Sequence, residues 1–205
     1  MNIEKIKLSD SLTIYKSKYD WKYSQDELVE KTKQNHILIG NDDYTTSSFH
    51  IQSNAINHVK EYGRKLVMQL MNVSEDSVDT WVEQHWIYFS NSSTTQPKNA
   101  LTFHSHPITL TTSSAKPIQN IKTDWTYCFY LKVPNDLIED EGKLMFRDSN
   151  NREHGILPEE GDIILFGPND LHVPNFIPNS KGERIAICSN VSLNVHTYKK
   201  ETTLF

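Results

Sequence analysis

The sequence lacks the features that mark secreted and membrane proteins. Its 205 residues include only two cysteines, Cys128 and Cys188, which are too few for a disulfide framework. No run approaches the roughly 18 consecutive apolar residues of a transmembrane helix. Residues 1–5 carry charged and polar side chains where a secretion signal needs an apolar stretch. We therefore expect a cytoplasmic protein that does not bind membranes.

The sequence also lacks a strong excess of charge of either sign. Lysine and arginine number 21 against 26 aspartate and glutamate residues, which gives a formal net charge of −5. This balance does not favour binding to nucleic acid. The chain is long enough to bury the core of one domain, and its sequence leaves the oligomeric state open.

The first part of the chain is expected to support the rest of the fold. Loose alternation of apolar residues over 3–23 indicates one or two short strands. Residues 24–34 begin with a serine followed by acidic residues, which is typical of a short helix. Residues 53–71 give the clearest helical pattern, with a serine at the N-cap. We assign residues 1–83 to a support region and residues 84–205 to the catalytic core, within one compact domain.

Short strands separated by turn residues dominate the second part. This pattern predicts a mainly β fold, a sandwich or a small barrel. Residues 107–123 show no clear pattern and are expected to form a long loop that closes over a substrate. The expected strands are Trp86–Phe89, Leu101–His106, Trp125–Val133, Lys143–Arg147, Asp162–Phe166, His172–Phe176 and Glu183–Leu193.

Three histidines in this part have a spacing that suits a metal ion. His104 and His106 are two residues apart, so on a strand both imidazoles point to the same face. Such a pair is equally typical of surface histidines, and by itself it is weak evidence. His172 follows a turn and opens a later strand, where it can join the first two.

The last expected strand presents two different faces. Alternation places Arg184, Ala186, Cys188 and Asn190 on one face, and a mostly aliphatic set on the other. The aliphatic face is suited to packing in the core. The face with small and polar residues and one arginine is typical of the ligand-bearing interior of a barrel.

Taken in order, these segments resemble the iron(II)- and 2-oxoglutarate-dependent oxygenases. The resemblance implies their fold, a double-stranded β-helix (jelly roll), here with the N-terminal helices as supports. The chain is most similar to the prolyl-hydroxylase-like branch and to small phage-type oxygenases, over roughly residues 84–193. The segments that carry the resemblance are His104-Ser105-His106, Thr126–Leu131 followed by Pro134, Gly161-Asp162 with Phe166, His172, and Arg184–Ile187.

The resemblance implies a cofactor, a cosubstrate and the residues that bind them. His104, His106 and His172 would be the iron(II) ligands, and Arg184 would bind the distal carboxylate of 2-oxoglutarate through its planar, bidentate guanidinium. Three further residues would lie beside the cosubstrate: Tyr130, Thr126 and Asn190. The implied reaction uses O2 to hydroxylate a small-molecule or peptidyl substrate.

One residue departs from the family pattern. The family has an aspartate two residues after the first histidine, and this chain has His106 there. Three neutral imidazoles leave the metal site one unit more positive than two histidines and a carboxylate. Asp124, at the start of a strand, is a less favoured candidate for the missing carboxylate.

Two other functions remain open at this point. A cupin, which is also a jelly roll, opens with the same histidine pair but adds a glutamate ligand a few residues later, and residues 107–118 contain no acid. A cupin also gives Arg184 no role. A metal-free binding or structural jelly roll would make the spacing of the histidines and Arg184 a coincidence.

Overall fold

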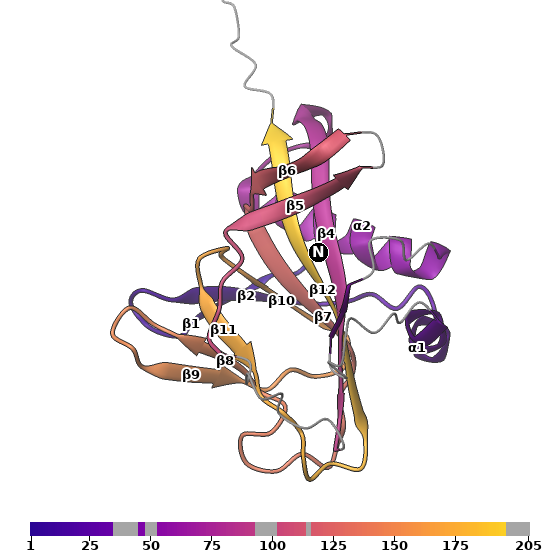
Figure 1. Ribbon diagram of the computed structural model, residues 1–205, viewed down its shortest axis with the longest axis vertical. Helices are drawn as coiled ribbons and strands as arrows, with labels where there is room; N and C mark the ends of the chain where they lie inside the picture. Colours follow the sequence, from indigo (N-terminus) through magenta and orange to yellow (C-terminus); the bar gives the residue numbers. More distant parts are fainter. Residues whose placement is uncertain (35–44, 48–52, 93–101, 114–115, 196–205) are drawn as a thin grey trace, which may run out of the picture.

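The computed structural model of the chain, drawn in Figure 1, describes residues 1–34, 45–47, 53–92, 102–113 and 116–195. It contains two α-helices, α1 (Gln25–Gln34) and α2 (Asn54–Met71), and one short 3-10 helix, η1 (Glu75–Ser77). No helix in the described part of the chain is long and apolar enough to cross a membrane. The strands are β1 (Glu4–Lys7), β2 (Thr13–Lys18), β3 (Thr45–Ser47), β4 (Val78–Asn91), β5 (Ile108–Ser113), β6 (Lys116–Lys122), β7 (Trp125–Lys132), β8 (Leu144–Arg147), β9 (Glu153–Ile156), β10 (Asp162–Phe166), β11 (Leu171–Pro174) and β12 (Glu183–Val195).

Most strands belong to two sheets that face each other. The larger sheet has the order β1-β2-β10-β7-β12-β4-β3, and the smaller has the order β11-β8-β9. The strand pairs of both sheets are antiparallel. Buried side chains from both sheets, such as Ile14, Phe146 and Phe166, pack together between them. The predicted mainly β jelly roll is therefore confirmed.

The two helices lie on the opposite face of the large sheet (Figure 1). The Ser53 hydroxyl caps α2 by accepting the Ile56 N–H at 3.1 Å. The helix ends at Asn72, which adopts a left-handed φ of 54°. Buried side chains of α2 pack with those of β7 and β12, including Phe129 and Ile187. Both helices predicted from the sequence are thus confirmed as supports of the sheet.

A buried polar network lies between α2 and the sheet. The hydroxyls of Tyr127 and Ser189 donate to Glu83 Oε1 at 2.6 Å and 2.7 Å, and His85 Nε2 lies 3.1 Å from Glu83 Oε2. Burial favours the protonated carboxyl, but His85 and the two hydroxyls outweigh burial and lower the pKa of Glu83. The helix meets this network at Gly63, where an added Cβ would lie 2.5 Å from Tyr127 Cζ.

Replacing Gly63 by alanine is expected to lower the free energy of unfolding by about 1–3 kcal/mol, because the new methyl group overpacks the core. Tyr127 cannot move aside easily, since its ring is fully buried and its hydroxyl is held by Glu83. Urea unfolding measures the change, with Asn57→Ala on the exposed side of α2 as the control. A Gly63→Ala protein that gained stability, as helix propensity alone predicts, would contradict this packing.

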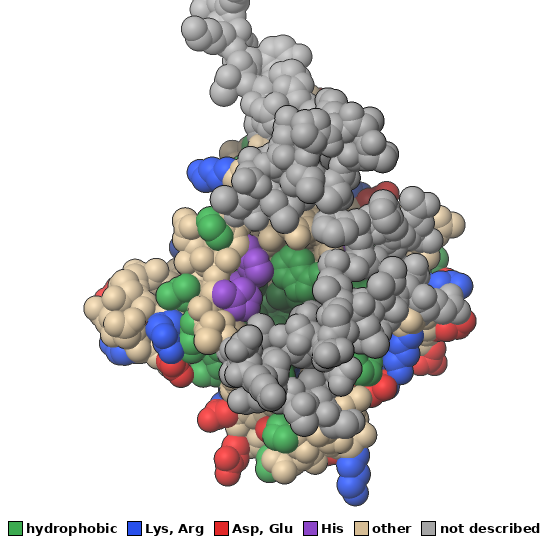
Figure 2. Space-filling view, viewed as in Figure 1, with side chains coloured by type: hydrophobic (Ala, Val, Ile, Leu, Met, Phe, Trp, Pro, Cys, Tyr) green, Lys and Arg blue, Asp and Glu red, His purple; other side chains and the backbone are tan. Residues whose placement is uncertain are grey.

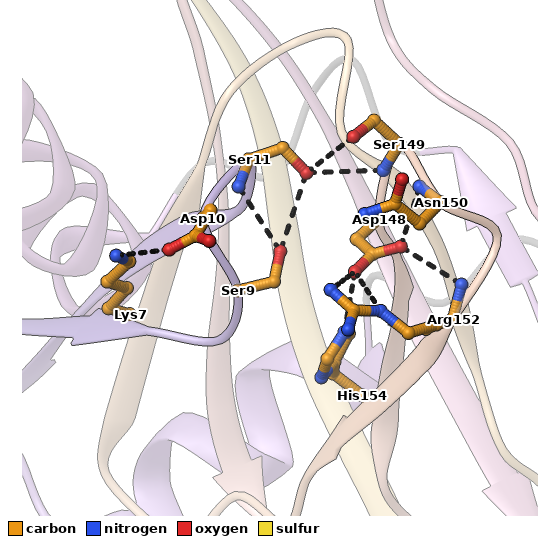
Figure 3. A network of polar contacts seen from close by, with 9 residues as sticks. All are labelled: Lys7, Ser9, Asp10, Ser11, Asp148, Ser149, Asn150, Arg152 and His154. Carbon is orange, nitrogen blue, oxygen red and sulfur yellow. Dashed lines mark hydrogen bonds and ion pairs between the residues drawn. The ribbon is translucent and has the colours of Figure 1, made fainter.

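A second polar network connects the two sheets at their turns (Figure 3). The Ser149 hydroxyl, in the turn between β8 and β9, donates to Ser11 Oγ in the turn between β1 and β2 at 2.8 Å. Asp148 Oδ1 accepts the N–H groups of Asn150 and Arg152, and its Oδ2 accepts the Arg152 guanidinium. These bonds fix the β8–β9 hairpin against the N-terminal strands, so this network has a structural role.

Two expectations about the segment around the first histidines are wrong. Residues 107–123 do not form a long loop; they contain the antiparallel hairpin β5–β6. Its threonine and isoleucine residues favour strands, although polar residues hide the alternation. The expected strand Leu101–His106 is not formed in its described residues, where only His104 makes a single bridge, with His172. Leu101 lies outside the described residues.

The other expected strands are present with somewhat different ends. The expected strand Trp86–Phe89 is the end of a much longer strand, β4, which pairs with β12 along its length. Residue 83, where we divided support region from catalytic core, lies inside β4, and that division stays a prediction. The first strands, β1 and β2, belong to the large sheet beside β10.

Candidate metal centre and anion pocket

Three histidines converge at the smaller sheet. His104 and His172 pair through two backbone hydrogen bonds of 3.1 Å and 2.9 Å, and the His106 N–H donates to the Pro168 carbonyl at 2.9 Å. The ring centroids are 4.6–5.0 Å apart. One potential ligand atom from each ring lies within 4.8 Å of the others. This is the convergence that the sequence predicts, with spacing suited to one shared metal ion.

Hydrogen bonds fix the protonation of two of the rings. His104 Nδ1 lies 2.9 Å from the Thr102 carbonyl oxygen, and His172 Nδ1 lies 2.9 Å from the Asp170 carbonyl oxygen. A carbonyl only accepts, so each Nδ1 is the nitrogen that donates its proton, and in the neutral form of either ring Nε2 is the nitrogen with the free lone pair. Metal-bound histidines are commonly oriented in this way.

The third ring has an unpaired nitrogen. His106 Nε2 is buried and has no hydrogen-bond partner among the described residues. The ring packs against Trp86, with a centroid distance of 5.0 Å, which fixes its orientation. A buried polar atom without a partner is costly unless a ligand satisfies it. The three imidazoles therefore fit a divalent metal that accepts nitrogen ligands.

Burial also keeps two of the imidazoles neutral. It lowers the pKa of His172 to about 3 and that of His106 to about 4, and the neighbouring histidines add to both shifts. Both rings are therefore in their uncharged form, with one N–H each, near neutral pH. No proton has to be displaced from them when a metal binds at that pH.

These shifts predict that the metal-free protein loses stability on acidification. The unfolded chain protonates both histidines below their ordinary pKa of about 6.5, and the folded chain does so only near the lowered values. The free energy of unfolding should therefore fall as the pH drops from about 6.5 toward 4, by up to about 1.4 kcal/mol per pH unit for each histidine. Urea unfolding over this range measures the slope. His172→Gln should reduce it, and an unchanged slope would contradict the assignment.

Arg184 forms a second unusual group in the same part of the molecule. Its side chain is 0% exposed, and Nη1 donates to the Gly142 carbonyl at 2.7 Å. The guanidinium Cζ lies 4.9 Å from the centroid of the Tyr88 ring. Among the described residues Nε and Nη2 have no hydrogen-bond partner, and the guanidinium makes no ion pair.

The two unpaired nitrogens of Arg184 lie on one edge of the planar guanidinium. This Nε–Nη2 edge is the one that binds a carboxylate through two parallel hydrogen bonds. The Gly142 carbonyl holds the remaining side and so orients the free edge. Because a buried cation without a counter-charge is costly, the arrangement fits an anionic ligand with a carboxylate group.

A single pocket connects the histidines with Arg184. Figure 2 shows histidine side chains at the rim of a hollow that is lined with hydrophobic side chains. The lining is mainly apolar, so a ligand carboxylate would have few competitors for the arginine. The pocket is lined by Trp86, Tyr88, His104, His106, Cys128, Tyr130, Leu144, His172, Pro174, Arg184, Ala186 and Cys188.

Of the other residues singled out in the sequence, one lines the pocket and the rest do not. Tyr130 lines the pocket with Arg184, as expected. Thr126 and Asn190 do not line it; the Thr126 hydroxyl donates to Asn190 Oδ1 at 3.0 Å, which links β7 to β12. Asp124 does not join the histidines, and its Oδ2 accepts the Leu193 N–H at 2.8 Å. Alternation along the strands correctly predicted which face points toward the pocket. It did not predict how far along each strand the pocket extends.

Sequence reasoning missed three residues that shape the site. Trp86 packs on His106, Tyr88 lies beneath Arg184, and Gly142 supplies the carbonyl that orients it. Alternation along β4 was a usable signal for the first two, because both lie on the face opposite the buried Ile87. No local pattern connects Gly142 with Arg184, since the contact spans 42 residues.

The fold is similar to that of solved prolyl-4-hydroxylase and 2-oxoglutarate-dependent iron(II) oxygenase structures, so the resemblance seen in the sequence is confirmed at the level of the fold. One similar structure is the Pseudomonas putida prolyl-4-hydroxylase, at a TM-score of 0.52 and 10% identity, covering 88% of this chain and 92% of that chain. No protein-family model and no curated protein matches the chain.

Two further solved structures are similar to this chain. HygX from Streptomyces hygroscopicus, solved with nickel, 2-oxoglutarate and hygromycin B, matches at a TM-score of 0.57 and 10% identity, over 92% of this chain and 85% of that one. The α-ketoglutarate-dependent epimerase SnoN of nogalamycin biosynthesis matches at 0.55 and 10% identity, over 87% and 77%. Similarity to the phage-type enzymes in particular stays a prediction.

Proposed function

We propose that the chain is an iron(II)- and 2-oxoglutarate-dependent dioxygenase that hydroxylates a small-molecule or peptidyl substrate. The observation that carries the proposal is that one pocket contains three converging imidazoles and a buried arginine with an unpaired carboxylate-binding edge. A metal ion satisfies the first group and a dicarboxylate satisfies the second. Iron(II) and 2-oxoglutarate meet both needs together.

The residues have separate tasks in this proposal. His104, His106 and His172 hold iron(II), and the Nε–Nη2 edge of Arg184 binds the distal carboxylate of 2-oxoglutarate. Tyr130 lies beside Arg184 in the pocket wall. When bound, iron(II) with 2-oxoglutarate and O2 supplies the oxidising power for attack on an unactivated C–H bond. The protein orients the cosubstrate and keeps water out of the apolar pocket.

The proposal includes two classes of primary substrate, peptides and small molecules. The similar structures include a prolyl-4-hydroxylase and an enzyme solved with hygromycin B, so both peptidyl and small-molecule substrates are compatible with this fold. The hairpin β5–β6 begins two residues after His106 and is suited to border the substrate. We therefore keep both substrate classes in the proposal.

The alternative functions explain the site less well. A metal-free jelly roll gives no reason for a buried, unpaired His106 Nε2 beside two oriented imidazoles. A cupin accounts for the histidines but leaves the buried edge of Arg184 without a ligand. The oxygenase proposal uses both features.

Turnover of the cosubstrate tests the proposal. With iron(II), 2-oxoglutarate and O2, the protein should form succinate above the rate without protein, and His172→Ala should abolish this activity. Succinate is measured by mass spectrometry, with and without candidate substrates. A protein that binds both iron(II) and 2-oxoglutarate but forms no succinate with any substrate would be a binding protein, contrary to the proposal.

The histidine at position 106 allows a separate prediction. His106→Asp should still bind iron(II), because a carboxylate is a good iron ligand. Its negative charge also lowers the net charge of the metal site by one unit. His106→Ala should weaken iron(II) binding by at least about 10-fold, since it removes one of three ligands. Affinities are measured without oxygen, with Asp124→Ala as the matched control. If Asp124→Ala lost affinity and His106→Ala did not, the ligand assignment would be wrong.

A further inference from the structure

The pocket contains a pair of cysteines to which the proposed function assigns no task. Cys128 on β7 and Cys188 on β12 are direct partners in the antiparallel register of the two strands. Both line the pocket, and their side chains therefore point to the same face of the sheet. They are 6% and 5% exposed, neither is in a disulfide, and they are the only cysteines in the sequence.

The geometry of this pair suits a covalent link. Directly opposed residues in antiparallel strands have Cα atoms about 4.5–5.5 Å apart, which lies within the roughly 4.4–6.8 Å that a disulfide spans. Neither strand has to move far, because β7 and β12 are already joined by the ladder on both sides of the pair. Both side chains reach the pocket, so a small oxidant has access to them.

We propose that Cys128 and Cys188 form a redox modification site, in which a hydroperoxide or a small disulfide converts the two thiols to a reversible cross-strand disulfide. The thiols together lose two protons and two electrons as the S–S bond forms. The two protons and two electrons reduce a hydroperoxide to an alcohol and water. With a small disulfide as the oxidant, they reduce it to two thiols. This inference does not depend on the proposed function.

The surroundings of the pair explain why the reduced form is the resting state. The hydrogen bond between Cys188 and Cys128 and burial both favour the protonated thiol and raise the pKa of Cys188, so it stays protonated near neutral pH. The thiolate is the reactive form, and oxidation should therefore accelerate as the pH rises. Reaction changes the pocket wall next to the Tyr130–Ala186 pair, the adjacent same-face pair of the two strands.

Oxidation of the intact protein tests the inference. The folded chain, treated with tert-butyl hydroperoxide in the absence of metal and then alkylated with N-ethylmaleimide after unfolding, should take up no maleimide. Its mass should fall by the two hydrogens lost, a digest should give the linked Cys128 and Cys188 peptides, and dithiothreitol should restore both thiols. A kinetic series should show faster closure at higher pH.

Two variants make the result decisive. Cys128→Ser and Cys188→Ser each retain one thiol and should form no internal link, taking up one maleimide or one small adduct instead. If the folded wild-type chain remained fully alkylatable under conditions that oxidise the unfolded chain, the inference would be overturned. Formation only of dimers linked between two chains would overturn it as well.

Discussion

Replacing Arg184 by methionine is expected to weaken the binding of 2-oxoglutarate while stabilising the ligand-free protein. The guanidinium is fully buried, makes no ion pair among the described residues, and uses only Nη1 in a hydrogen bond. Methionine has a similar length and needs no counter-charge, so the free energy of unfolding should rise by about 1 kcal/mol or more. The lost bidentate contact should weaken 2-oxoglutarate binding by about 10- to 100-fold, or about 1.5–3 kcal/mol.

Three measurements on one protein preparation check this prediction: urea unfolding without ligands, nickel(II) affinity, and 2-oxoglutarate affinity of the nickel-loaded protein. Nickel(II) affinity should be nearly unchanged, since Arg184 is not a metal ligand. Arg184→Lys is the matched variant; it keeps the charge but lacks the planar edge, and it should not restore full 2-oxoglutarate affinity. Loss of stability together with loss of both ligands would show instead that Arg184 is a structural residue.

His172→Ala is expected to abolish metal binding, with a loss of affinity of at least about 100-fold. In the proposed site His172 supplies one of three ligands, and its Nδ1–H bonds to the Asp170 carbonyl, which leaves Nε2 for the metal. The remaining pair, His104 and His106, has only two nitrogens to offer. Isothermal titration with nickel(II) or with iron(II) under anaerobic conditions measures the loss.

His154→Ala is the control for this experiment. His154 Nε2 binds Asp148 Oδ2 at 3.2 Å in the network that connects the two sheets, and it is not part of the metal cluster. Its replacement should leave the metal affinity unchanged even if it lowers stability. Equal losses in the two variants would mean that the metal is bound elsewhere or that folding is impaired.

The fold was predictable because glycine, proline and other turn residues separate most of its strands in the sequence. The segment Gly161–Phe166 illustrates this: Gly161 adopts a φ of +83°, and Asp162 caps the turn by accepting the Glu159 N–H at 2.7 Å. The strand that follows is buried throughout, as its unbroken apolar sequence indicates. The hairpin β5–β6 was missed because threonine, lysine and other polar residues interrupt the apolar residues of its two strands, so no clear alternation marks them in the sequence.

The proposed metal centre was more predictable than the proposed cosubstrate site. His104 and His106 are close in sequence, and the family resemblance pointed to His172 at a later strand start as the third member. The cosubstrate site depends on contacts across the fold, such as the Gly142 carbonyl on Arg184. Thr126 and Asn190 share the correct face but are bonded to each other, two register pairs beyond the cysteines.

The most direct test of the account is an anaerobic titration of the protein with iron(II) and then 2-oxoglutarate, followed by visible absorption. The account predicts a metal-to-ligand charge-transfer band that appears only when both are present, because 2-oxoglutarate must chelate iron held by the three histidines. The band should be absent in His172→Ala and should need a much higher 2-oxoglutarate concentration in Arg184→Met. If the wild-type protein gave no band at saturating concentrations of both, the assignment of this pocket to iron(II) and 2-oxoglutarate would be contradicted.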